Sequence, residues 1–369
     1  MALFILGKNG MKLRKCLIGA FVGAALPLAL ASAPACAADL STAKDGIALS
    51  NAYAGNTWRQ QMLAIWDLAS RAAIADGVIA RTKVVNADNS APQQASQIGD
   101  LTLEGWKAIV IDAASPTALN GVIQQACSAH IVVVVFDSLA TAPCAYQVAL
   151  NYVNWGTSEA EYVAKRLNGK GNVLEVRGVA GTSVDNDIHQ GIVETFAKYP
   201  AIKLVGSVHG NWTQSIAQKE VAGILPTLPK VDAVVTQGGD GYGTYQAFKL
   251  AGRKTPLIIM GNRQDELALW KQLSDAPGGY ETFSIGSPPG VSSIAFWVAQ
   301  QILAGAKVPK IVNVPFVVVT AADLGAWLKV VPPGGVATGV YDQDWTRKLI
   351  VANLANTAPP PSPIPTRAP

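Results

Sequence analysis

Short apolar runs alternate with helix-like patterns along most of the chain. In the first half, strands are predicted over 47–49, 82–85, 108–111 and 131–136, with helical spacing after Trp58 and over 119–129. In the second half, strands are predicted over 173–176, 203–208, 233–236 and 257–260, with helices over 159–167, 188–199, 214–225 and 245–251. Continuous apolar strands that alternate with helices indicate parallel sheets covered on both faces. Two such sets predict an α/β protein with two similar, doubly wound lobes.

Polar residues follow several of these strands directly. The strand at 173–176 leads into a glycine-punctuated loop that ends in Thr182 and Ser183, and the strand at 131–136 leads into Asp137 and Ser138. Because parallel sheets bind ligands at the carboxyl ends of their strands, these loops are candidate ligand-binding segments. Further apolar runs at 282–285 and 312–319 are candidates for segments that pass back between the lobes.

The chain begins with the pattern of an export signal. Basic residues at 12–15 precede an apolar stretch over 16–31, and Ala35-Cys36-Ala37 fits a small-x-small cleavage site. Glycines and Pro27 interrupt the apolar stretch, which disfavours a permanent membrane anchor. We expect a signal peptide over 1–37 and a mature protein in the periplasm of a Gram-negative bacterium. A lipid-modified Cys36, and a start at Met11 instead of Met1, are alternatives.

The charge balance argues against nucleic acid as a partner. Over the whole chain 29 Lys and Arg oppose 25 Asp and Glu, and the leader holds four of the basic residues and none of the acidic ones. The mature chain is therefore close to neutral, and the basic character of the full sequence comes from its leader.

Two cysteines, Cys127 and Cys144, follow the leader and flank the predicted strand at 131–136. An even pair in an oxidising compartment predicts a disulfide, and two buried free thiols are the alternative. Closing a loop of this size would stabilise the fold by about 3 kcal/mol in the chain-entropy model.

Motifs for catalysis and for metal binding are absent from the sequence. The chain has no GxSxG, Walker A, HExxH or CxxC motif, and its three histidines show no metal-ligand spacing. The glycine-rich segment at 238–243 does not match the dinucleotide-binding pattern GxGxxG. We expect no catalytic residues, no metal and no cofactor.

The mature chain resembles the periplasmic sugar-binding proteins of the ribose-binding type, which serve ABC importers. The resemblance runs from Asp45 to about Thr320 and rests on an ordered set of short segments. These are Asn56-Thr57-Trp58, Val135-Phe136-Asp137-Ser138, Val179-Ala180-Gly181-Thr182-Ser183, Asn211-Trp212, Gln237-Gly238-Gly239-Asp240, and Ile302-Leu303-Ala304-Gly305 followed by Lys307-Val308.

The resemblance implies two parallel-sheet lobes joined by a hinge of three crossings, with the ligand cleft between them. We expect residues 38–152 and about 287–318 to form the N-terminal lobe. Residues 153–286 and about 319–350 would form the C-terminal lobe, and 351–369 a proline-rich disordered tail.

The family's pocket, carried over position by position, implies a set of ligand-binding residues. The set is Asn51, Tyr53, Asn56, Trp58, Asp137, Ser138, Asn186, Trp212, Gln237, Asp240 and Asn262. Trp58 and Trp212 would cover the apolar faces of a sugar ring, while amides and carboxylates would bond its hydroxyl groups.

Some positions depart from the ribose binders. Ser138 and Asn186 stand where arginines are expected, Asn262 replaces an aspartate, and Gly286 replaces the hinge glutamine. This pocket is therefore predicted to be less cationic than a ribose site and to take a different ligand.

Several of these residues also have a purely structural interpretation. Trp58 could be the first core residue of its helix, and Asn262 a turn residue. Asp137, Asn186 and Asp240 could each cap a helix.

The function predicted from the resemblance is capture of a sugar, polyol or related small solute for an ABC permease in the inner membrane, by a monomer. One alternative is a periplasmic ligand sensor that docks onto a chemoreceptor or sensor kinase. Another is a secreted carbohydrate-active enzyme that uses Asp137 and Asp240 as a carboxylate pair. A lactose-repressor-type regulator shares the fold, but the leader stands where its DNA-binding helices would be.

Overall fold

The computed structural model describes residues 41–339 and 341–363, so the predicted leader at 1–37 lies outside the described residues. The strands of the first half, together with one strand from the last fifth of the chain, form a six-stranded sheet in which every neighbouring pair is parallel. In spatial order its strands are β11 (Ile311–Asn313), β5 (Tyr146–Ala149), β4 (Val132–Phe136), β3 (Ala108–Asp112), β1 (Gly46–Asn51) and β2 (Arg81–Asn86).

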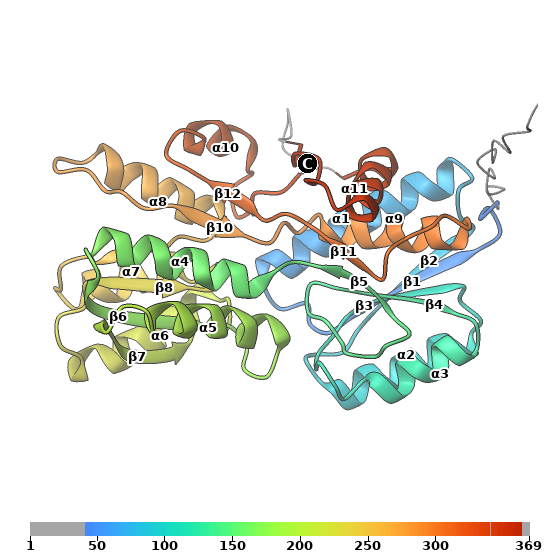
Figure 1. Cartoon of the computed structure of the whole chain (residues 1–369), viewed down its shortest axis with the longest axis horizontal. Helices are drawn as coiled ribbons and strands as arrows, with labels where there is room; N and C mark the ends of the chain where they lie inside the picture. Colours follow the sequence, from blue (N-terminus) through green and yellow to red (C-terminus); the bar gives the residue numbers. More distant parts are fainter. Residues whose placement is uncertain (1–40, 340, 364–369) are drawn as a thin grey trace, which may run out of the picture. The chain divides into compact units, whose positions relative to one another are not determined.

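Helices cover both faces of this sheet, as the apolar strands predict. Ile47 and Leu49 of β1 pack with residues of α1 (Thr57–Ala75) and α9 (Val291–Leu303). Ala48, between them, points to the other face, where α2 (Ala91–Leu103) and α3 (Asn120–Ser128) pack. Figure 1 shows the two helix pairs on opposite sides of the sheet. We call this sheet and its helices the first lobe.

The second half builds a similar layered unit. Its parallel sheet has the order β7 (Ala201–His209), β6 (Lys170–Arg177), β8 (Ala233–Thr236) and β9 (Leu257–Ile258). One face packs against α4 (Tyr152–Arg166) and α5 (Ser183–Phe196), and the other against α6 (Gln214–Ile224) and α7 (Gly241–Leu250). A short 3-10 turn (Leu225–Thr227) follows α6. The predicted α/β class with two doubly wound lobes is confirmed.

A short antiparallel pair extends the second sheet. β10 (Ser284–Gly286) pairs with β12 (Val317–Val319), and a parallel bridge joins Met260 to Ser284. The helices α8 (Gln264–Asp275) and α10 (Leu324–Val330) pack against each other beside it. We call the second sheet, this pair and their helices the second lobe.

The apolar run at 312–319 forms two short strands in different sheets. β11 joins the first lobe and β12 the second. Pro315 lies between them, and proline cannot donate to a strand ladder. This segment is one of the crossings between the lobes.

Two predictions near the C-terminus are corrected. Helix α11 (Gln343–Ala355) packs against α9 and β11, so residues 343–350 lie with the first lobe and not the second. The helix also continues past the predicted start of the tail at 351. Beyond it, Trp345 Nε1 donates to the carbonyl oxygen of Pro361 at 3.1 Å, which holds the described part of the tail to the helix. The other lobe boundaries stay a prediction.

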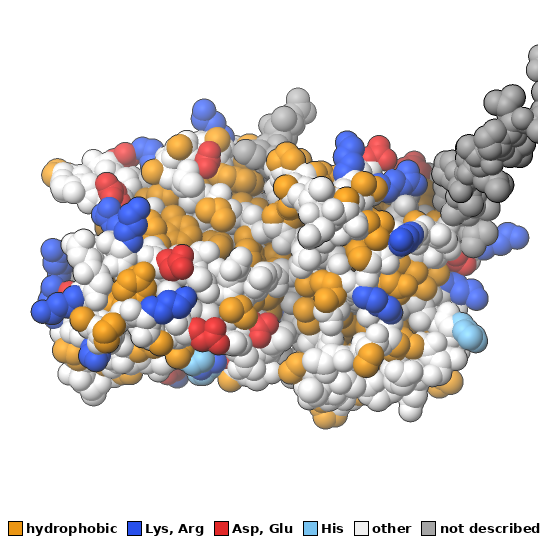
Figure 2. Space-filling model, viewed as in Figure 1, with side chains coloured by type: hydrophobic (Ala, Val, Ile, Leu, Met, Phe, Trp, Pro, Cys, Tyr) orange, Lys and Arg blue, Asp and Glu red, His pale blue; other side chains and the backbone are white. Residues whose placement is uncertain are grey.

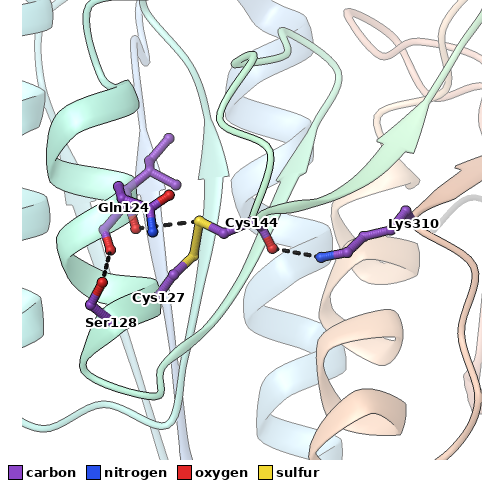
Figure 3. The surroundings of a disulfide bond; sticks show 6 residues. Gln124, Cys127, Ser128, Cys144 and Lys310 are labelled. Atoms are coloured by element: carbon purple, nitrogen blue, oxygen red, sulfur yellow. Dashed lines mark hydrogen bonds between the residues drawn. A yellow bond between two sulfur atoms is a disulfide. The ribbon is translucent and has the colours of Figure 1, made fainter.

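Cys127 and Cys144 form a disulfide that ties the end of α3 to the loop before β5 (Figure 3). Lys310 Nζ donates to the carbonyl oxygen of Cys144 at 2.7 Å, so the β11 edge strand is fastened to the same loop. The cross-link lies wholly within the first lobe.

Charged side chains of both signs are scattered over the face of the molecule seen in Figure 2, without one large basic patch on that face. Within the described part of the chain, none of the helices has the length and apolarity needed to cross a bilayer.

Candidate functional site

A cavity lies where the strand ends of both lobes meet. It encloses about 70 Å³ that the centres of water molecules can reach. Its wall comes from Asn56, Trp58, Arg59, Asp137, Trp155, Val184, Trp212, Gln237, Gly238, Gly239, Asn262, Arg263, Gly286, Ser287 and Val336. Nearly all follow the carboxyl end of a strand or begin a helix after one, which is where parallel sheets bind ligands.

The predicted site residues divide into two groups. Six of them line the cavity: Asn56, Trp58, Asp137, Trp212, Gln237 and Asn262. The others lie outside its wall: Asn51, Tyr53, Ser138, Asn186 and Asp240. That any of them contacts a ligand stays a prediction.

A buried arginine organises the wall of the first lobe. Arg59 is 5% exposed and forms ion pairs with Asp112 and, at 3.7 Å, with Asp137 Oδ2. Its Nη1 donates to Asn51 Oδ1 at 3.1 Å. Asn51, predicted as a ligand contact, thus positions Arg59. Burial lowers the pKa of Arg59, and the charge of Asp137 opposes that shift.

Asp137 is the carboxylate that the first lobe presents to the cavity. Its backbone is left-handed, with φ 53°, directly after β4. Tyr152 at the start of α4 donates its hydroxyl to Asp137 Oδ1. Burial raises the pKa of Asp137, whereas Arg59 and the Tyr152 hydrogen bond lower it.

Three tryptophans enclose the cavity, each held by a different contact. Trp58 Nε1 donates to the carbonyl oxygen of Ser287 at 2.8 Å, and Trp155 Nε1 donates to Glu159 Oε1 at 2.5 Å. Trp212 lies against the backbone of Gly178, where a Cβ atom would stand 2.2 Å from the indole ring. Indole rings fixed in this way offer flat apolar surfaces to a ligand.

Among the lining residues outside the predicted set, three lie on helices, namely Arg59, Trp155 and Val184, and the others lie in loops or at the end of β10. Trp155 lies on α4, which begins seven residues before the predicted start at 159 because Asn151 caps it. Arg59 lies in the first turn of α1, where a charged residue is usually solvent-exposed. Asp112, the ion-pair partner of Arg59, is the last residue of β3. Its position at a strand end is the sequence feature that could have indicated it.

Asn186 is exposed on α5 and lies outside the cavity wall. The helix begins at Ser183 with Thr182 as its N-cap, five residues before the predicted start. This start turns Val184 to the cavity and Asp185 inward, where Asp185 pairs with Arg177 Nη2 at 2.7 Å. Gln237 Nε2 then donates to the carbonyl oxygen of Asp185 at 3.1 Å.

Asp240 does not line the cavity either; it is fully buried at the N-terminus of α7. Neither of its carboxyl oxygens has a hydrogen-bond partner among the described residues. Burial, together with Glu266, raises the pKa of Asp240 well above its ordinary value. Burial also raises the pKa of Glu266 to about 7. Both groups lie behind the wall of the second lobe.

Tyr53 and Ser138, which also lie outside the cavity wall, make contacts within the first lobe. The carbonyl oxygen of Tyr53 accepts from Asn51 Nδ2 at 2.8 Å, and its ring packs over Gly55. Ser138 is 1% exposed, and its carbonyl oxygen accepts from Ala113 across the strand ends. Among the described residues, no cluster of three or more His, Cys, Asp or Glu side chains could hold a metal ion.

Hydrogen bonds join the two lobes at the rims of the cavity. On one rim Gln61 Nε2 donates to the carbonyl oxygen of Val336 at 3.1 Å, and Val336 N donates back to Gln61 Oε1 at 2.8 Å. On the other, Leu139 N donates to Ser183 Oγ at 3.0 Å. The structure therefore holds the lobes in contact across the cavity.

The family model of a periplasmic binding protein domain matches residues 47–307. The chain belongs to this periplasmic binding protein family. The resemblance to the ribose-binding type is thereby confirmed at the level of the family, whose members bind substrates.

Solved and curated relatives agree with this family. An ABC transporter solute binding protein from Thermobispora bispora is 40% identical with a TM-score of 0.82, covering 87% of this chain and 99% of that one. A xylitol-binding protein of Mycolicibacterium smegmatis is 32% identical over 49% of this chain and 53% of its own length. The ribose import binding protein of Escherichia coli is 25% identical over 48% of this chain and 60% of its own length. The chain thus spans about half to three fifths of the length of these two curated relatives.

Proposed function

We propose that the protein captures a sugar, polyol or related small solute for import by an ABC transporter. The observation that carries this proposal is the cavity between the lobes, lined by three indole rings and by polar strand ends. The names of the relatives agree with it, since they include xylitol and ribose binders.

The cavity chemistry suits a polyhydroxylated ligand of monosaccharide size. Rings such as those of Trp58 and Trp212 cover C–H faces, while Asn56 and Asp137 can bond hydroxyl groups. About 70 Å³ of the cavity is open to the centres of water molecules, and from this small space we infer a ligand of about four to six carbons.

An enzymatic role for the cavity has little support. A glycoside hydrolase needs two carboxyl groups that flank the bond it cleaves. Asp137 lines the cavity, but its predicted partner Asp240 is fully buried behind the wall. We infer a binding protein without a catalytic step.

We also propose an extracytoplasmic location, the periplasm, and action as a monomer beside a membrane permease. The family and the leader pattern in the sequence support this location. The Cys127–Cys144 disulfide agrees with it, because disulfides persist in oxidising compartments.

Isothermal calorimetry of the mature protein against monosaccharides, alditols and their oxidised derivatives tests the proposal. We expect one binding site per chain and at least one ligand of four to six carbons in the micromolar range or tighter. Hydrolysis of glycosides, or the absence of any binder of this class, would overturn the proposed function.

A further inference from the structure

Most polar groups of the cavity wall are already bonded within the protein. Gln237 accepts from Gly178 N and donates to Asp185 O, and Asn262 Nδ2 donates to Val317 O at 2.8 Å. The indole N–H groups of Trp58 and Trp155 donate to the carbonyl oxygen of Ser287 and to Glu159 Oε1, respectively. These side chains shape the cavity but have few free polar atoms for a ligand.

The side-chain nitrogens that stay free are donors. Asn56, Trp212 and Arg263 line the wall. Their Asn56 Nδ2, Trp212 Nε1, Arg263 Nε and Arg263 Nη1 atoms make no hydrogen bond to any described residue. On the acceptor side stands Asp137, which already receives the hydroxyl of Tyr152. Among these side chains, free donors therefore outnumber free acceptors, whereas each hydroxyl of a neutral polyol both donates and accepts.

The two arginines of the wall differ in their charge partners. Arg59 is ion-paired with Asp112 and Asp137. Arg263 donates from Nη2 to the carbonyl oxygen of Trp212 at 2.8 Å, and it has no carboxylate within 4 Å among the described residues. An arginine without a carboxylate partner at a binding cavity is suited to a ligand carboxylate, which it can hold in bidentate fashion.

Two buried carboxyl groups, those of Asp240 and Glu266, interact with the charge of Arg263 from behind the wall. The positive charge of Arg263 lowers the pKa of both carboxyl groups. Burial acts more strongly and raises the pKa of both carboxyl groups. Neither carboxyl group forms an ion pair with Arg263 among the described residues.

On the basis of the proposed function, we propose that the ligand is a sugar acid of four to six carbons whose carboxylate contacts Arg263. Its hydroxyl groups would donate to Asp137 at the opposite lobe, and its carbon chain would lie between the indole rings. The donor-rich second lobe and the acceptor of the first lobe thus orient the ligand across the cleft.

Calorimetry with matched pairs tests this assignment. Each pair consists of an aldonate and the alditol of the same configuration, such as D-xylonate with xylitol and D-gluconate with sorbitol. We expect the acid to bind about tenfold more tightly or better, because hydrogen bonds to a charged group are the stronger ones. The salt dependence of binding should be larger for the acid than for the alditol.

The variant R263Q should remove this preference, so that acid and alditol bind with affinities within about threefold of each other. R71Q, which removes an exposed arginine on α1, is the matched control and should keep the preference. Circular dichroism checks that R263Q is folded. If R263Q does not fold, the comparison of acid and alditol binding by the wild-type protein still tests the assignment. Equal or tighter binding of alditols by the wild-type protein would overturn the sugar-acid assignment and leave the proposed function intact. Binding of neither class would overturn both.

Discussion

Glu266 is fully buried in the second lobe, and burial raises its pKa from 4.5 to about 7. A carboxyl group with a raised pKa in the folded state contributes fully to stability below pH 4.5, and this contribution is lost as the pH rises through 7. Between pH 5 and pH 8 the free energy of unfolding of the wild type should therefore fall relative to E266Q, by on the order of 3 kcal/mol. Urea denaturation at both pH values measures the difference.

The neutral variant is expected to keep the contact that Glu266 Oε1 accepts from Gly241 N at 2.8 Å. E161Q, which removes an exposed carboxylate from α4, tests whether loss of one negative charge alone changes the pH profile. Parallel stability profiles for wild type and E266Q would contradict the argument from burial.

Gly178 allows the indole ring of Trp212 to lie against the backbone at the cavity. A Cβ atom on Gly178 would come within 2.2 Å of that ring, so G178A must displace Trp212. We expect G178A to lose about 1–3 kcal/mol of stability by overpacking. G121A in helix α3 is the control, because a Cβ atom there meets nothing within 4 Å.

Alanine is the better helix former, so G121A should gain about 0.5–1 kcal/mol where G178A loses stability. Thermal unfolding of the two variants beside the wild type measures both signs. A G178A protein as stable as the wild type would show that Trp212 is free to move away.

At the scale of single residues, the sequence reveals those site residues that directly follow a strand. Asp137 and Trp212 line the cavity because each comes at a strand end in a left-handed backbone conformation. Trp155 and Arg59 could not be assigned in this way. They lie on helices, where a pattern of apolar positions does not distinguish a side chain that faces a ligand from one that faces the core.

At the scale of elements, the Gln61 side chain on α1 forms two hydrogen bonds with the backbone of Val336. Val336 lies in a loop. This loop is anchored to the second lobe, since Ala337 N donates to Asn262 O and Gln264 N donates to Gly335 O. The Gln61 side chain does not line the cavity, so it can favour the closed arrangement without touching a ligand. Each of its two hydrogen bonds is worth about 0.5–1.5 kcal/mol.

We expect Q61A to bind the ligand found by calorimetry about tenfold more weakly, mainly through faster dissociation. Q60A is the matched control, because the neighbouring Gln60 donates to Ala54 within the same lobe. Stopped-flow dissociation rates compare the two variants with the wild type. Equal rates for Q61A and Q60A would show that the Gln61–Val336 hydrogen bonds do not contribute to closure of the lobes.

The strands were predictable because parallel strands buried on both faces read as continuous apolar runs. The short β5 was missed, and its residues are only partly apolar and half-buried at its start. Helix starts were less predictable. In α4 and α5 the first turn is polar, and the residues that define the start are the caps Asn151 and Thr182.

At the scale of the whole molecule, the two-lobe fold follows from the repeat of strands and helices, but the crossings between lobes do not. The chain passes from β11 to β12 within a few residues, and α11 returns to the first lobe. These contacts join segments far apart in sequence, and the local apolar pattern contains no information on which lobe a short strand will join.

The Cys127–Cys144 disulfide lies within the first lobe and away from the cavity, so it should affect stability and not binding. The bridge closes a loop with a sequence separation of 17 residues, which corresponds to about 3 kcal/mol in the chain-entropy model. The double variant C127A/C144A should lose about this amount in urea denaturation and keep the ligand affinity of the wild type. Wild-type protein reduced with a phosphine should behave like the variant. A loss of affinity in both would instead mean that the loop between α3 and β5 is coupled to the ligand cavity, because Asp137 lies in the chain between the two cysteines.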